Sequence, residues 1–324
     1  MRSCREARGL NQQAFAEWLN AELERSYDRS RISRWESGKE AVPAKVALFL
    51  NAHAAEPPPE PKSRGDRKAL TIALANQKGG VGKTTSAVNL ASALALLGQR
   101  VLLIDSDPQA SATIYLGFNP RELEERQATL YYALLRGRRL EDLVVPVGRF
   151  ALVPSSITLA SADTELIGEP FSSAVLREKV QETVTGQFDF ILIDCPPTLS
   201  LLTVNALSAA DRVLIPVKTE FLDIMGIPLL LDTIEKIRRR GNPDLTVMGV
   251  LPTMYNARFT QDRETLEELR TKLGGRTRVY EPINRSTGYG QSAAAGRPTV
   301  EVLPATPGVQ FYRDIAKELV DGQA

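Results

Sequence analysis

Two hydrophobic patterns alternate along most of this chain. Compact apolar runs within residues 70–75, 101–109 and 188–197 predict buried strands, and the last two runs contain acidic residues near their ends. Stretches with apolar positions at helical spacing, such as residues 86–97, follow such runs. This alternation predicts an α/β fold with a doubly wound, mostly parallel sheet.

The beginning of the chain carries only the helical pattern. Asn11 can cap a helix over residues 12–19, and Ser30 can cap a second helix with Ile32 and Trp35 on its inner face. We therefore expect a small all-α unit before the α/β part.

A change in composition separates these two parts. Residues 53–68 read HAAEPPPEPKSRGDRK, in which proline and charge replace the apolar periodicity. We predict a helical domain over residues 1–52, a linker over residues 53–68 and a larger α/β domain over residues 69–324.

Overall composition excludes several kinds of site. The 324 residues carry a net charge of +1, so any binding of nucleic acid must come from local basic patches. A single histidine argues against a zinc site or a Ser-His-Asp triad. Cys4 and Cys195 form no disulfide or metal pattern, and no apolar run reaches the ~18 residues that a membrane helix needs. We expect a cytoplasmic protein without a membrane segment.

The sequence KGGVGKTT lies between a predicted strand and a predicted helix, where it is typical of a phosphate-binding turn. Its glycines let the backbone approach a polyphosphate, and Lys83 would reach the β- and γ-phosphates. Gln77 stands where the usual motif has its first glycine, and Lys78 is an additional lysine. The predicted ATP-binding residues are Lys78, Gly79, Gly80, Val81, Gly82, Lys83, Thr84 and Thr85.

Three acids near the ends of predicted strands should share the edge of the sheet where the turn lies. Asp194 fits a carboxylate that holds Mg²⁺ through water, together with the Thr84 hydroxyl. Of Asp105 and Asp107, one would help the metal while the other orients a water molecule.

Residues 5–20, 31–39 and 46–50 resemble the helix-turn-helix domain of the Cro and phage-repressor type. The resemblance implies that the helix near Ser30 enters the major groove of DNA. The sequence departs from that family in a short first helix and a long connection over residues 21–30. The implied contacts are Arg29, Ser30, Arg31, Ser33, Arg34 and, on phosphate, Lys39. A helical protein-interaction domain with a solvated arginine face is the alternative.

The variant turn, DSDPQ at residues 105–109 and ILIDCPP at residues 191–197 together resemble the ParA branch of the ParA/MinD ATPases. This resemblance implies a homodimer that sandwiches two ATP molecules, with Lys78 reaching the partner's nucleotide. It also implies that Asp107 positions the hydrolytic water and that Asp105 and Asp194 belong to the metal side. Adenine would lie near Met254, Asn256 and Pro282.

A predicted helix over residues 229–240 ends in a basic group, Lys236, Arg239 and Arg240. Such a group also suits an ordinary solvated helix end. The family resemblance favours sequence-independent DNA binding by these residues.

Together, these features predict a nucleoid-associated, Mg²⁺-dependent ATPase that partitions a plasmid or chromosome with a centromere-binding, ParB-like partner. Its N-terminal domain would bind an operator and repress its own operon. Alternatives are an ATPase that positions a protein cargo, a nucleotide-sensing transcriptional regulator and a metabolic ligase. A membrane-bound ATPase is disfavoured, because residues 311–320 mix acidic and basic side chains and lack a cationic amphipathic face.

Overall fold

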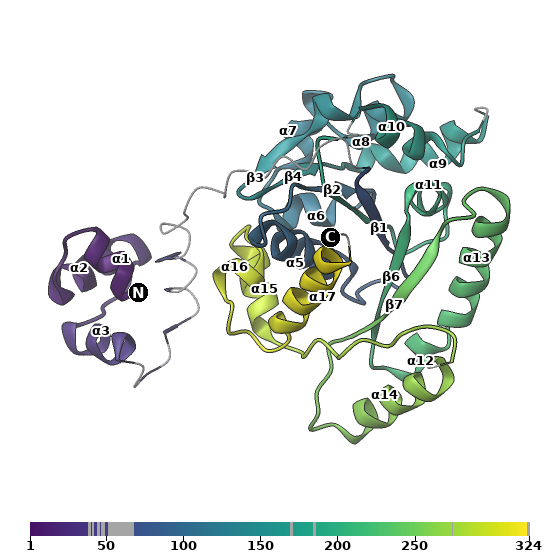
Figure 1. Cartoon of the computed structure of the whole chain (residues 1–324). Helices are drawn as coiled ribbons and strands as arrows, with labels where there is room; N and C mark the ends of the chain where they lie inside the picture. Colours follow the sequence, from purple (N-terminus) through teal and green to yellow (C-terminus); the bar gives the residue numbers. More distant parts are fainter. Residues whose placement is uncertain are drawn as a thin grey trace.

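The computed structural model describes residues 1–37, 40, 42–43, 46, 49–50, 68–168, 171–183, 186–273 and 275–322 (Figure 1). Lys39 and nearly all of the predicted linker, residues 53–67, lie outside these ranges. Among the described residues, none of the helices combines the length and hydrophobicity needed to cross a membrane.

Three helices open the chain: α1 (Arg2–Ala7), α2 (Gln12–Leu23) and α3 (Arg29–Glu36). Phe15 and Leu19 of α2 are fully buried against Ile32 and Trp35 of α3, and Val46 and Leu50 complete this separate hydrophobic cluster. The side chain of Asn11 accepts a hydrogen bond from the backbone N–H of Ala14 at 2.9 Å, so the predicted cap of α2 is confirmed.

Two details of the helical segment differ from the prediction. Asp28, not Ser30, caps α3, since its side chain accepts the N–H of Arg31 at 2.8 Å. Ser30 lies inside the helix and donates its hydroxyl to Asp28 at 2.8 Å. Helix α2 also continues to Leu23, where Glu24 ends it in a left-handed conformation with φ 51°. The connection to α3 is therefore shorter than residues 21–30.

A seven-stranded sheet with the order β3-β4-β2-β5-β1-β6-β7 forms the centre of the larger part. Among the strand pairs of the described residues, only β3–β4 is antiparallel, which confirms the predicted mostly parallel sheet. The strands are β1 (Leu70–Leu74), β2 (Val101–Asp105), β3 (Val145–Val147), β4 (Phe150–Val153), β5 (Phe190–Asp194), β6 (Arg212–Lys218) and β7 (Thr246–Thr253).

Strand register brings the predicted acids to the end of the strand that leads into the phosphate turn. Asp194 pairs in register with Leu74, the last residue of β1, and with Asp105, the last residue of β2. Three central strands therefore deliver their functional ends to one edge of the sheet.

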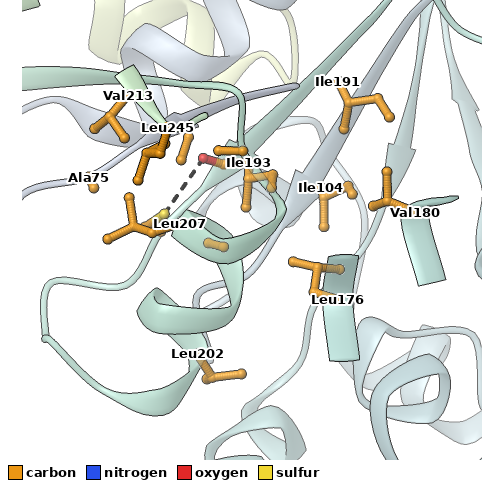
Figure 2. Close-up of a cluster of buried hydrophobic side chains, with 14 of the residues drawn as sticks. Ala75, Ile104, Leu176, Val180, Ile191, Ile193, Leu202, Leu207, Val213 and Leu245 are labelled. Atoms are coloured by element: carbon orange, nitrogen blue, oxygen red, sulfur yellow. Dashed lines mark hydrogen bonds between the residues drawn. The ribbon is translucent and has the colours of Figure 1, made fainter. Parts of the chain in front are cut away.

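Helices cover both faces of the sheet, because successive strand residues point to opposite sides. Ile72 and Leu74 pack with α5 (Lys83–Leu96) and α17 (Val309–Asp321), whereas Ala73 and Ala75 face the other layer. Figure 2 shows part of that second layer, a buried cluster that includes Ile191 and Ile193 of β5 as well as Leu176, Leu202 and Leu207.

The second layer is built by α8 (Leu130–Leu135), α10 (Val175–Thr183), α11 (Leu201–Ala209) and α13 (Ile227–Arg240). The remaining helices are α6 (Ser111–Tyr115), α7 (Pro120–Glu125), α9 (Ala162–Glu165), α12 (Phe221–Ile224), α14 (Thr260–Leu273), α15 (Thr287–Ala294) and α16 (Thr299–Val302), with short 3₁₀ turns at Leu140–Leu143, Ile157–Ser161 and Leu166–Gly168.

Candidate nucleotide-binding site

The predicted phosphate turn connects β1 to α5 and has the backbone shape that its glycines allow. Gly80 and Gly82 have φ values of 68° and 84°, in the left-handed region that favours glycine. Gly82 is the N-cap of α5, a helix of 14 residues, so free N–H groups and the positive end of the helix face the turn. This arrangement suits a bound phosphate chain.

Lys83 lies across the turn. Its side chain is nearly buried, and its Nζ donates to the carbonyl oxygen of Lys78 at 2.9 Å. Burial lowers the pKa of Lys83, while the negative charges of Asp194 and Asp107 oppose that shift. A buried ammonium held by one carbonyl can turn toward a phosphate at the cost of a single hydrogen bond.

Asp194 has the fewest hydrogen-bond partners of the three predicted acids. It is fully buried, and neither carboxylate oxygen has a hydrogen-bond partner among the residues that the structure describes. Burial raises its pKa well above the ordinary value, as does the charge of Asp105, whereas the Thr84 hydroxyl and Lys83 moderate the rise. A buried carboxylate without hydrogen-bond donors destabilises the folded protein unless a cation neutralises it. Asp194 and Thr84 therefore fit the predicted oxygen ligands of Mg²⁺.

Asp105, unlike Asp194, accepts several hydrogen bonds from its own chain. One of its oxygens accepts the backbone N–H and the hydroxyl of Thr113 at 2.8 and 2.7 Å, and the other accepts the N–H of Asp107 at 3.2 Å. Burial nevertheless raises the pKa of Asp105 to about 6. Its carboxylate is committed to the loop after β2, so its predicted metal role stays a prediction.

Asp107 lies in that same loop, beside Lys83 and close to Asp194. Its Oδ1 accepts the N–H of Gln109 at 2.9 Å, and burial raises its pKa while Lys83 opposes the rise. The described contacts leave Oδ2 available to another donor, as the orientation of a water molecule would require.

Lys78 contacts an acid of its own chain. Its Nζ is 2.5 Å from Oδ1 of Asp223, whose side chain is only 7% exposed and belongs to α12. Its backbone N–H donates to the side chain of Asn76 at 3.0 Å. No sequence pattern identifies Asp223 as a partner of Lys78, because it lies 145 positions further along the chain.

A cavity of about 370 Å³ opens beside the turn, between Gly82, Met254 and the C-terminal segment. Met254 lines it and is exposed, so an adenine contact at Met254 stays a prediction. Asn256 and Pro282 do not line it: the side chain of Asn256 turns back to the N–H of Arg258 at 3.1 Å, and Pro282 is buried. The remaining lining residues are Thr85, Tyr115, Thr253, Ile283, Asn284, Arg285, Ser286, Tyr289, Gly290, Ala293 and Tyr312.

Thr253, at the end of β7, is a positioning residue that the sequence did not reveal. Its buried hydroxyl donates to the carbonyl oxygen of Val81 at 2.8 Å and also lies 3.1 Å from that of Val217. It therefore ties the turn to β6 and β7. A threonine at a strand end is too common to be recognised without the fold.

The predicted DNA-binding residues form two separate groups. At the end of α13, Lys236, Arg239 and Arg240 are exposed, although Arg239 pairs with Glu235 at 2.9 Å. On α3, Arg29, Ser30, Arg31, Ser33 and Arg34 are exposed, but Arg31 and Arg34 both pair with Glu40. Both surfaces are basic, and both are partly neutralised by acids.

A glycine-rich turn between β1 and α5, a buried lysine across it and an unpaired aspartate beside it define a P-loop nucleotide-binding protein. A family model described as an AAA domain matches residues 69–247. The chromosome-partitioning ATPase Soj of Thermus thermophilus is 41% identical over 78% of this chain and 96% of its own. The sporulation initiation inhibitor protein Soj of Bacillus subtilis is 39% identical over 76% and 97%. The chain therefore belongs to the ParA/Soj family of P-loop ATPases.

A solved structure supports the same assignment. The structure named cobyrinic acid a,c-diamide synthase, from Mycobacterium smegmatis, contains an ATP analogue and magnesium. It is 33% identical, covers 78% of this chain and 94% of its own, and has a TM-score of 0.65. Its bound molecules agree with the predicted cofactors, ATP and Mg²⁺.

We predict that Asp194→Asn stabilises the nucleotide-free protein in the absence of magnesium, by roughly 1–3 kcal/mol at pH 8. The folded protein holds the Asp194 proton more tightly than the unfolded chain does. The contribution of Asp194 to stability is therefore lost as pH rises from 3.8 through the raised folded pKa. Asparagine does not titrate, so the advantage of the variant should grow with pH in thermal melts from pH 5 to 8. Asp142→Asn, at an exposed acid, is the matched control; a difference that stayed constant with pH would contradict the argument.

Proposed function

We propose that this protein is a DNA-partitioning ATPase that dimerises on ATP, binds DNA without sequence preference and leaves the DNA after hydrolysis. The observation that carries the proposal is the pair of lysines in one turn: Lys78 at its start, and Lys83, which binds the carbonyl oxygen of Lys78 and lies near the buried Asp194. The relatedness to partitioning ATPases supports it. The protein would work in the cytoplasm, on the nucleoid.

Hydrolysis needs positioning and charge neutralisation more than covalent chemistry. The N–H groups of the turn and Lys83 would hold the phosphates, with Lys83 leaving the carbonyl of Lys78 to do so. Thr84 and Asp194 would hold Mg²⁺, which supplies charge neutralisation at the β- and γ-phosphates. Asp107 would orient the attacking water through its free oxygen.

Lys78 would act on the partner subunit's nucleotide, which requires it to leave Asp223 first. The ion pair with Asp223 is thus an arrangement of the single subunit that competes with dimerisation. Because the nucleotide would lie between subunits, loss of its γ-phosphate would weaken the dimer, and hydrolysis would time its release.

DNA would contact the ATP-bound dimer through the basic end of α13, and the N-terminal helices would bind an operator and repress the partition operon. A centromere-binding, ParB-like protein would stimulate hydrolysis. The synthase named above shares the fold, so nucleotide binding alone does not separate the two functions; ATP-dependent binding of random DNA does.

Asp107→Ala should still bind ATP and dimerise, but should hydrolyse ATP about 10²-fold more slowly, because the attacking water loses its orientation. Lys83→Ala should instead lose nucleotide affinity, by about 10- to 100-fold, because it removes a charge-assisted hydrogen bond. Phosphate release measures the turnover of Asp107→Ala. ATP-dependent sedimentation measures whether each variant binds ATP and dimerises. Wild-type turnover by Asp107→Ala would show that another residue positions the water.

Asp223→Asn should free Lys78 and let the ATP-bound dimer form at about 1.5- to 5-fold lower protein concentration, the range expected for loss of one partly exposed ion pair. Light scattering with ATP measures the dimer. Glu220→Gln, at a nearby exposed acid, controls for the change in charge. Equal or weaker dimerisation of Asp223→Asn would mean that the ion pair does not compete with assembly.

Changing Lys236, Arg239 and Arg240 together to glutamate should abolish ATP-dependent binding to random DNA while ATP binding persists, because phosphate contacts supply most nonspecific affinity. The control changes Arg121, Arg126 and Arg139, which are exposed elsewhere, to glutamate. Fluorescence anisotropy across a salt series measures binding. Intact DNA binding by the first triple variant would place the DNA surface elsewhere.

A further inference from the structure

One carboxylate binds two of the three α3 arginines that are predicted to contact DNA, Arg31 and Arg34. Glu40 accepts the Nε of Arg31 at 3.0 Å on one oxygen and the Nε of Arg34 at 2.9 Å on the other. The indole N–H of Trp35 reaches the first oxygen at 3.3 Å, and the backbone N–H of Glu40 donates to the carbonyl oxygen of Arg34 at 3.3 Å. We call this arrangement the Glu40 clamp.

Aromatic rings and a second acid fix the clamp further. The Arg31 guanidinium lies 5.6 Å from the Trp35 ring centroid and 5.9 Å from that of Tyr27. Asp28, the cap of α3, adds another negative charge near both arginines. The hydrogen bond from Arg34 lowers the pKa of Glu40, so the clamp is charged at neutral pH.

These contacts occupy the groups that nucleic acid would use. Arginine recognises phosphate and guanine with the same planar fork of N–H donors that it offers to a carboxylate. The side chains of Arg31 and Arg34 remain 45% and 47% exposed, so the clamp is open to solvent and can be broken. A phosphate brought to either arginine would also face the negative charge of Glu40.

We propose that Glu40 is an intramolecular competitor of DNA, which lowers the affinity of the α3 surface for phosphates and sets how selective its binding is. A site that offers only phosphates must displace Glu40 without compensation, whereas a site with well-placed base edges offsets that cost. This inference rests on the proposed role of the N-terminal helices in DNA binding.

The test uses the full chain without nucleotide, so that the ATP-dependent surface does not contribute. Glu40→Gln should bind a random duplex about 2- to 30-fold more tightly than wild type, the range expected for loss of two exposed ion pairs. The slope of log affinity against log salt should steepen by about 1 to 2, since each freed arginine can neutralise one more phosphate. Preference for the DNA upstream of the gene over random DNA should fall.

Two variants separate this effect from a general change of charge. Glu22→Gln removes the same charge from an exposed position on α2 and should leave affinity and salt slope unchanged. Glu40→Asp retains the charge and should bind more like wild type than Glu40→Gln does. In the Glu40→Gln background, Arg31→Ala and Arg34→Ala together should remove the gain.

The possible results test two claims separately: that Glu40 competes with DNA, and that α3 binds DNA at all. If wild type binds through Arg31 and Arg34 and Glu40→Gln binds no tighter, the competition is wrong while the DNA-binding role stands. Weaker binding by Glu40→Gln would show that the carboxylate orients the arginines for DNA. If neither protein binds DNA without nucleotide, both the competition and the DNA-binding role of α3 are wrong.

Discussion

The rest of this site depends on one interaction that the described residues leave open: the buried carboxyl group of Asp194 has no hydrogen-bond donor among them. Asp194 is held at the end of β5 by register with β1 and β2, so it cannot move away from the phosphate turn. Its charge acts on two neighbours: burial lowers the pKa of Lys83 while the charge of Asp194 opposes that shift, and burial raises the pKa of the adjacent Cys195 thiol, which the charge of Asp194 raises further. That thiol contacts the carbonyl oxygen of Ile193 at 3.8 Å, the dashed line in Figure 2, and remains an ordinary part of the core. The end of β5 therefore holds a buried carboxyl group whose ionisation a bound cation would favour.

The sequence was most informative where local chemistry and position in the fold coincide. The phosphate turn could be recognised because glycine, lysine and threonine occur there in fixed order between a strand and a helix. Asp105, Asp107 and Asp194 could be placed together because the ends of parallel strands meet at one edge of the sheet. Both inferences need only short segments and one topological rule.

Contacts between distant segments could not be predicted in this way. Nothing near Asp223 or Thr253 in the sequence distinguishes them from other residues of their type. Their contacts with the phosphate turn arise from the order of β1, β6 and β7 in the sheet. The predicted adenine contacts Asn256 and Pro282 show the same limit: they are close in sequence to cavity residues, but neither lines the cavity beside the turn, and their adenine role stays a prediction. At α3, the sequence favoured Ser30 as the cap, although Asp28 was equally suitable and lay at the actual start of the helix.

The hydroxyl of Thr253 has a consequence for how the protein is made. It joins the turn to a strand that lies 172 positions later in the chain. At ribosomal rates of roughly 5–20 residues per second, those 172 positions take about 10–35 seconds to synthesise, so a nascent chain carries its phosphate turn for that time without its anchor. The hydrophobic cluster of helices α1–α3 lies within the first 50 residues, so these helices can fold during this interval. On the ribosome, the N-terminal unit therefore precedes a completed nucleotide site.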